Sequence, residues 1–319
     1  MTASESVATD SFTDIRRGLV LMVTGSFLIP GLDAAAKLLT ERHDLSAGEI
    51  GLLRFLLQTL MVLPLLLATE GTAGLRIERP LLNLLRGVLL GLATFLFFTA
   101  LKFMPLADAT AIFFIEPMLV TILSVVFLKE TVGWRRGVAI LVGFAGAMIV
   151  IRPNFLALGP VAVLPALTAA CVAVYAVLSR SLSKGSSPLA MHFYAGLGGL
   201  AALSVACAYG VATGVPDLAL TMPEGPEAWV LILTLGVFAT VCHLMFIHAY
   251  RLAPASLLAP FGYIEIISAV LLGFVLFGEF PDPAKWVGIA VIMGSGIYIA
   301  WRENLVVRRK TLLAIPEHP

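Results

Sequence analysis

Two glutamates lie deep inside long apolar stretches of this chain. Glu116 and Glu265 are 149 residues apart, and each stands about ten residues into its apolar run. A charged side chain near the centre of a bilayer costs at least about 2.5 kcal/mol on insertion scales, so acids at such positions usually face a cavity or a partner. These two could bind polar groups of a substrate or carry a proton. A hydrogen bond or ion pair that locks two helices together is the alternative, and the sequence leaves both open.

The spacing of 149 residues extends beyond the two acids. The same shift places further like residues on one another: Gly87 on Gly236, Pro105 on Pro254, Phe114 on Tyr263, Ile115 on Ile264, Leu123 on Leu272 and Glu130 on Glu279. Internal repeats in a strongly apolar chain are typical of secondary transporters, whose substrate site lies where the two halves meet near the bilayer midplane. The repeat therefore indicates a shared site that contains both glutamates.

A second group of charged residues lies in the first two expected apolar runs. Asp33 and Lys37 are four residues apart, which places them on one face of a helix in the favourable acid-first order. Arg54 enters from the outer end of the next apolar run. All three fall in the outer half of the membrane and could meet there. The cluster would then close an outer gate, receive a polar ligand, or form a static ion pair.

Proline and glycine interrupt several apolar runs, and we expect hinges at Pro30, Gly31, Pro117 and Pro260. Proline removes a backbone donor and frees a carbonyl, which the membrane interior tolerates beside protein or a watery cavity. Curvature that serves packing alone is the alternative.

Aromatic and histidine side chains complete the candidate site. Phe114, Tyr175 and Tyr263 could stack on a flat heteroaromatic ligand, although aromatic residues that face lipid are equally expected. His243 is either a hydrogen-bonded packing residue or a proton relay.

The composition requires a membrane around these residues. Of the 319 residues 59% are hydrophobic and 13% are charged, and the mean hydropathy is +0.98. A soluble domain of this length is far less apolar. The net charge of +1 provides no general basic surface, so we expect a lipid bilayer and a small-molecule metabolite as partners and no nucleic acid. The pattern assigns no oligomeric state.

The elements that must position the site are transmembrane helices. About 20 apolar residues are needed to cross the hydrocarbon core. By that measure the sequence predicts ten spans: residues 18–39, 47–68, 80–101, 106–128, 133–151, 157–179, 187–209, 226–248, 255–277 and 284–301. Gly87 and Gly91 form a pair of small residues four apart, which should let two helices approach closely.

The basic residues predict the orientation of the spans. With the N-terminus inside the cell, fourteen Lys and Arg residues fall on the cytoplasmic side and four on the other side, as the positive-inside rule requires. The expected organisation is a cytoplasmic tail (1–17), a first half of five spans (18–152), a second half of five spans (153–302) and a cytoplasmic tail (303–319). Because five is odd, the two halves should be inverted relative to one another.

Several motifs resemble the EamA-like transporters of the drug/metabolite transporter superfamily. They are residues 101–111 and their echo at 250–255, Lys129-Glu130, Gly278-Glu279 and residues 143–152. The resemblance implies a ten-helix carrier with a central cavity lined mainly by spans one, three, four, six, eight and nine. Within the family, residues 113–117 and 28–33 look most like the branch that contains riboflavin importers.

The expected function is therefore a secondary transporter of the bacterial inner membrane that takes up riboflavin by alternating access. S-adenosylmethionine uptake or export of amino acids or other metabolites by the same fold is the alternative. A membrane enzyme acting on a lipid-borne substrate is a candidate of a different class, but mirrored acids and short loops argue against it. The sequence has no Walker-type loop and no His-Glu-x-x-His motif, so we expect no enzyme activity, cofactor or metal.

Overall fold

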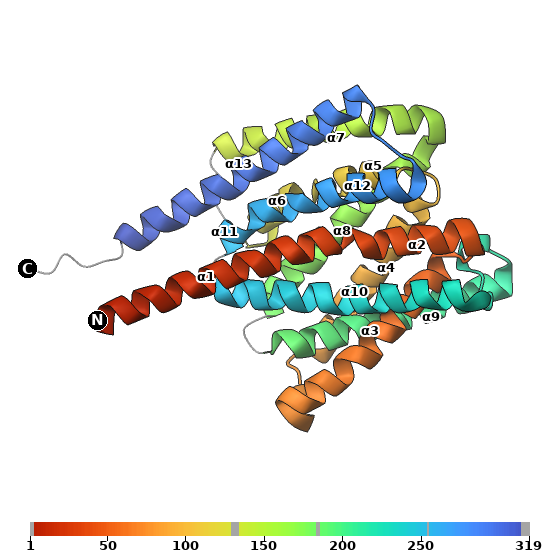
Figure 1. Ribbon diagram of the computed structural model, residues 1–319, viewed down its shortest axis with the longest axis horizontal. Coiled ribbons are helices and arrows are strands. Elements are labelled where there is room, and N and C mark those ends of the chain that lie inside the picture. The colour runs from red at the N-terminus through yellow and green to blue at the C-terminus, as the bar shows by residue number, and fades with distance from the viewer. Residues whose placement is uncertain (1–2, 129–133, 183–185, 254, 314–319) are drawn as a thin grey trace, which may run out of the picture.

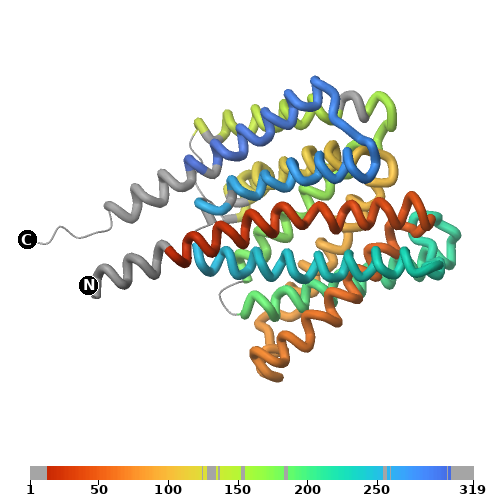
Figure 2. Tube along the Cα trace, viewed as in Figure 1, coloured from red at the N-terminus to blue at the C-terminus, as the bar shows by residue number. Residues whose placement is uncertain are grey.

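The chain folds into a bundle of helices. The computed structural model describes residues 3–128, 134–182, 186–253 and 255–313, and Figure 2 follows their course. In the first half the elements are α1 (Ala3–Leu28), α2 (Pro30–His43), α3 (Ala47–Glu70), the 3₁₀ helix η1 (Gly71–Leu75), α4 (Pro80–Leu101), α5 (Leu106–Phe113), α6 (Glu116–Leu128) and α7 (Trp134–Leu158). In the second half they are η2 (Gly159–Val163), α8 (Leu164–Leu182), α9 (Pro188–Thr213), η4 (Pro216–Leu218), α10 (Gly225–Leu252), α11 (Ala255–Leu258), η5 (Ala259–Tyr263), α12 (Ile264–Phe277) and α13 (Pro283–Leu313).

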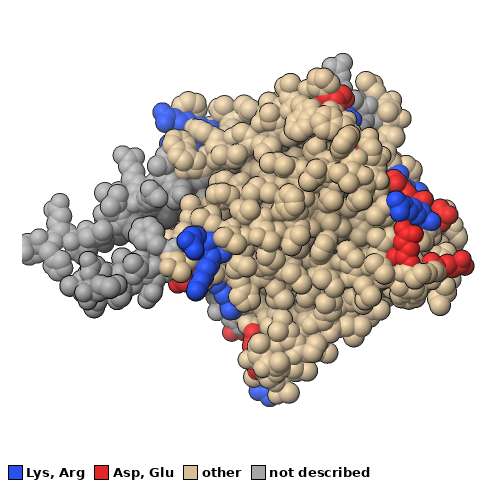
Figure 3. Space-filling model, in the orientation of Figure 1, with Lys and Arg blue, Asp and Glu red and all other residues tan. Residues whose placement is uncertain are grey.

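The helices are those of a multi-pass membrane protein. Among the described residues, eight helical segments are long and apolar enough to cross a bilayer, and they coincide with eight of the ten predicted spans. The predicted fifth and tenth spans correspond to two shorter apolar stretches, Gly137–Ile151 in α7 and Pro283–Ile299 in α13. In Figure 3 charged side chains gather at the two ends of the molecule, and the band between them is almost free of charge.

The first and last helices are longer than the sequence predicts. Most of the stretch 1–17, expected as a tail, belongs to α1, which begins at Ala3. Most of the stretch 303–319 belongs to α13, which ends at Leu313. The apolar-span criterion misses these extensions because it follows hydropathy, whereas a helix in water needs no apolar residues to continue.

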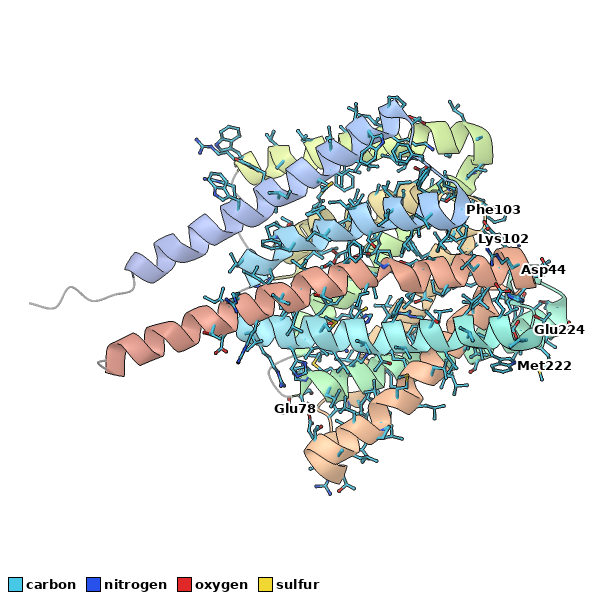
Figure 4. All side chains as sticks on the ribbon, in the orientation of Figure 1. Asp44, Glu78, Lys102, Phe103, Met222 and Glu224 are labelled. Atoms are coloured by element: carbon cyan, nitrogen blue, oxygen red, sulfur yellow. The ribbon has the colours of Figure 1, made fainter. Side chains whose placement is uncertain are left out.

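Both termini lie at the same end of the bundle, on the left of Figure 1. We call this the terminal end and the opposite end the distal end. Figure 4 places Asp44, Lys102, Phe103, Met222 and Glu224 at the distal end and Glu78 at the terminal end. Successive membrane helices run in alternating directions between the two ends (Figure 1).

The two halves pack mainly against one another. Helix α4 packs on α8 and α9, α10 packs on α1, α2 and α3, and α7 packs on α13. The predicted close approach at Gly87 is confirmed: a Cβ atom there would lie 2.4 Å from the backbone oxygen of Ala195 and 2.7 Å from the Cα of Gly198. Gly91 meets Gly199 one turn further on. Small residues thus bring α4 and α9 into backbone contact.

Helix ends fix the turns that carry the site. The side chain of Ser46 accepts a hydrogen bond of 3.0 Å from the Glu49 N–H and so starts α3. Gly278 ends α12 at a φ of +68°, a conformation that favours glycine. The backbone N–H of the next residue, Glu279, then donates to the Gly273 oxygen at 3.0 Å. This C-cap fixes the position of Glu279.

Candidate functional site

Three helix breaks lie at the predicted hinge residues. Pro30 starts α2 directly after α1 ends, and Gly31 follows with the Phe238 ring packed against it. Pro117 is the second residue of α6, where a proline costs no hydrogen bond. Pro260 lies within η5, just before α12. The helices are interrupted at these positions, and movement about the interruptions is a proposal.

The breaks place the two glutamates at the starts of helices. Glu116 is the first residue of α6 and Glu265 is the second residue of α12, so both lie in a first helical turn. The N-terminal turn of a helix carries a partial positive charge that stabilises an anion. Broken helices whose N-terminal ends point into the membrane interior are a known basis of transporter sites.

Asp33 joins the two glutamates, and we call Asp33, Glu116 and Glu265 the acidic cluster. Glu265 interacts electrostatically with both of the other acids, although the three lie on three different helices. Each of the three keeps part of its surface accessible. Within the part of the chain that the structure describes, none of them forms an ion pair or a side-chain hydrogen bond. Such a cluster is suited to a cation, whether a proton or a positive group on a ligand.

Arg54 lies beside the acidic cluster. Its guanidinium donates a hydrogen bond to the hydroxyl of Thr94 and lies 4.7 Å from the centre of the Phe55 ring. It acts electrostatically on Asp33 without forming an ion pair. Asp33 and Arg54, which the sequence suggests could meet, are thus neighbours but form no salt bridge.

The prediction that Lys37 joins Asp33 and Arg54 is wrong. The Lys37 ammonium lies 2.6 Å from Glu279 Oε1 and donates to the Met104 carbonyl oxygen at 2.9 Å. Four residues of helix carry Lys37 about 6 Å closer to the distal end than Asp33. The long lysine side chain therefore meets the turn after α12.

Lys37 belongs to a set of ion pairs that we call the distal ion-pair network: Lys37, Asp108, Glu279 and Lys285. The Lys285 ammonium lies 2.6 Å from Asp108 Oδ2, and Glu279 Oε2 accepts the backbone N–H of Leu106 at 3.1 Å. Residues of the first half are thereby tied to the turn between α12 and α13. Glu130, the repeat counterpart of Glu279, lies outside the described residues.

Two aromatic residues at equivalent repeat positions contact one another. The ring centres of Phe114 and Tyr263 are 4.9 Å apart at an angle of 37°. Each residue lies two positions before one of the glutamates, Phe114 before Glu116 and Tyr263 before Glu265. The Tyr263 hydroxyl is buried and has no hydrogen-bond partner in the described structure. We call these residues the aromatic pair.

The remaining predicted residues, Tyr175 and His243, both interact electrostatically with Arg54. The Arg86 guanidinium stands 4.9 Å from the centre of the Tyr175 ring. His243 stacks on His192, with ring centres 5.0 Å apart at an angle of 23°. Neither expected role of His243 is tested by this packing.

Sequence reasoning missed His192 and Gln58 as interior polar residues. Gln58 is fully buried, and neither of its amide atoms has a hydrogen-bond partner in the described structure. The available signal was a polar residue in an apolar span. That signal is weak because a single polar residue can also lie at a lipid-facing or loop-proximal position.

Comparison with known proteins gives a consistent picture. The model of the EamA-like transporter family matches twice, over residues 16–152 and 160–301. A protein of Vibrio cholerae named riboflavin transporter is 28% identical over 93% of this chain and 97% of its own length. An S-adenosylmethionine uptake transporter of Rickettsia conorii is 26% identical over 87% and 90%, and a pseudopaline exporter of Pseudomonas aeruginosa is 28% identical over 90% and 96%. A solved crystal structure that is 21% identical shares the fold, with a TM-score of 0.61 over 91% of this chain and 97% of that one.

Proposed function

The chain belongs to the EamA-like transporter family, and we propose that it is a secondary transporter of the bacterial inner membrane that takes up riboflavin by alternating access. The observation that carries the proposal is the meeting of equivalent residues from the two halves. The aromatic pair is in contact, and Glu116 and Glu265 interact electrostatically. A substrate held there would touch both halves, which is the arrangement that alternating access uses.

Helix packing supports two inverted repeats of five spans each. When a twofold axis relates two halves, exchanging them must map each helix contact onto another contact. The contact of α4 with α9 then corresponds to that of α10 with α3, and the contact of α4 with α8 corresponds to that of α10 with α1 and α2. The α7–α13 and α5–α12 contacts map onto themselves. All of these contacts are present, and so are the alternating helix directions (Figure 1).

The charge distribution supports cytoplasmic termini. Arg135 and Arg251 lie at the terminal ends of α7 and α10, and Arg16 and Arg17 lie within α1 on the terminal side of its apolar part. Cytoplasmic loops are enriched in basic residues. The terminal end is then cytoplasmic and the distal end faces the periplasm.

We infer that the described conformation is closed at the distal end. The distal ion-pair network joins α2 and the start of α5 to the turn after α12 and the start of α13. Hydrogen bonds to charged groups each contribute about 1.5 to 3 kcal/mol. The network would have to break whenever the site opens toward the periplasm.

Replacing Lys37 by glutamine is therefore expected to favour opening of the distal end. Opening is measured in a variant that carries Ala109→Cys and has its three native cysteines replaced by serine. Ala109 is fully buried, so a membrane-impermeant thiol reagent should label the introduced thiol only when the distal end opens. Loss of about 1.4 kcal/mol of closure would increase the open population about tenfold. Lys102→Gln is the matched control, because it breaks the exposed pair with Asp217 at the same end and such pairs contribute little. Equal labelling of the two variants would refute the closure.

S-adenosylmethionine is the second candidate substrate. Riboflavin offers a flat ring for the aromatic pair but no positive charge, whereas S-adenosylmethionine combines a flat base with cationic groups that suit an acidic cluster without ion pairs. Uptake of each radiolabelled compound into proteoliposomes separates the two. Saturable riboflavin uptake that excess S-adenosylmethionine does not inhibit would support riboflavin as the substrate. Saturable S-adenosylmethionine uptake that excess riboflavin does not inhibit would contradict it.

A further inference from the structure

A groove runs between α7 and α13 at the terminal end of the bundle. Its volume is about 420 Å³, within the range of small-ligand sites of roughly 300 to 1,000 Å³. The residues that line it are Trp134, Arg135, Val138, Ala139, Val142, Gly294, Ser295 and Tyr298. The hydroxyl of Ser295 already donates to the Ala139 oxygen at 2.5 Å. The groove therefore offers an apolar channel with one charged group, Arg135.

Arg135 is free to bind an anion. Its side chain is exposed, and its guanidinium lies 5.5 Å from the centre of the Trp134 ring. Within the described residues it forms no ion pair. The planar guanidinium presents several donors in a geometry that matches phosphate oxygens.

Aromatic side chains mark the mouth of the groove as a membrane–water boundary. Trp134 is 74% exposed and Trp301 is 54% exposed, and the Trp301 ring lies 5.9 Å from that of Tyr298. Exposed tryptophan and tyrosine at helix ends are enriched at the level of lipid headgroups. Arg135 thus lies at headgroup level, and the apolar part of the groove extends into the hydrocarbon.

The floor of the groove is open because of a glycine. No atom lies within 4 Å of the position that a Cβ would take on Gly294. The exposed side chains of Val138 and Val142 form the wall on α7. The missing side chain on α13 leaves space for a hydrocarbon chain beside them.

We propose that this groove binds an anionic glycerophospholipid, with one acyl chain between α7 and α13 and the phosphate on Arg135. The charge of Arg135 and the apolar depth of the groove select both parts of such a lipid. Basic pockets between membrane helices on the cytoplasmic side are suited to anionic headgroups. A second copy of the chain could cover the apolar wall, but it would leave the guanidinium without a partner of opposite charge.

Native mass spectrometry of the purified protein tests the proposal with titrated phosphatidylglycerol, phosphatidylcholine and inorganic phosphate. We expect phosphatidylglycerol to bind at least about tenfold more tightly than phosphatidylcholine, a difference of about 1.4 kcal/mol, and inorganic phosphate to bind far more weakly. Arg135→Gln should remove the preference for phosphatidylglycerol. Gly294→Leu, which fills the groove, should weaken binding of both lipids.

Two variants serve as matched controls. Arg251→Gln removes an exposed arginine elsewhere at the terminal end, and Gly137→Leu adds the same side chain to α7 at a position that also has no atom within 4 Å and does not line the groove. Both should bind lipid as the unchanged protein does. The proposal would be overturned if the two lipids bound equally or if Arg135→Gln and Arg251→Gln had equal effects. It would also be overturned if Gly294→Leu changed the oligomeric state of the protein without reducing lipid binding.

Discussion

Replacing Glu265 by glutamine is expected to reduce the transport rate at least about tenfold while leaving the protein folded in the membrane. Glu265 interacts with both other members of the acidic cluster, so its loss removes the group that connects them. Glutamine keeps the shape of the side chain but can neither carry a proton nor bind a cation by charge. A tenfold loss corresponds to about 1.4 kcal/mol of interaction with the transported species. Glu116→Gln should have an effect of the same kind.

Glu49→Gln is the matched control for this experiment. Glu49 is another glutamate in the interior, but its carboxylate accepts hydrogen bonds from the backbone N–H and the hydroxyl of Thr221 at the distal end. Its replacement should lower stability and leave initial uptake rates per folded molecule largely unchanged. Wild-type rates for both Glu116→Gln and Glu265→Gln would refute the role of the acidic cluster.

Replacing Gly87 by valine is expected to destabilise the bundle by about 3 kcal/mol, the upper end of the usual cost of overpacking. The added side chain would meet backbone atoms of Ala195 and Gly198, which cannot move aside as a flexible side chain can. The packing of α4 on α9, which joins the two halves, would have to separate. Thermal unfolding of the purified protein in detergent measures the change.

Gly137→Val separates this clash from the intrinsic effect of valine in a helix. Gly137 lies within α7 and has no atom within 4 Å of a Cβ position. The control should stay within about 0.5 kcal/mol of the unchanged protein, as surface substitutions do. A Gly87→Val variant as stable as the Gly137→Val variant would show that α4 and α9 do not depend on their close contact.

The helices could be predicted from the sequence because the bilayer imposes a length of apolar chain. Predicted span 80–101 is α4, and predicted span 47–68 differs from α3 by two residues at one end. The breaks in spans four and nine were indicated by Pro117 and Pro260. The sequence did not indicate that the acids would lie in the first turn of α6 and α12, because a proline fixes where a helix is disturbed and not how it restarts.

The partners of the charged residues could be predicted only in part. Spacing along one helix placed Asp33 and Lys37 on one face, but a lysine side chain is long enough to choose between partners one turn apart. Its partner Glu279 is 242 residues away in the sequence and lies beside it only in the folded bundle. The repeat matches Phe114 with Tyr263 as equivalent positions, but their contact was not predicted, because the sequence does not tell how near the axis between the halves they lie.

Counterflow in proteoliposomes is the most direct test that this chain is a carrier. Vesicles are loaded with an excess of one unlabelled compound, either riboflavin, S-adenosylmethionine or an aromatic amino acid. Entry of the same compound in labelled form is then followed. A carrier with one site between its halves should accumulate label transiently, with a saturable initial rate that Glu265→Gln strongly reduces. Linear, non-saturating flux without accumulation, or recovery of a chemically changed product, would contradict the account.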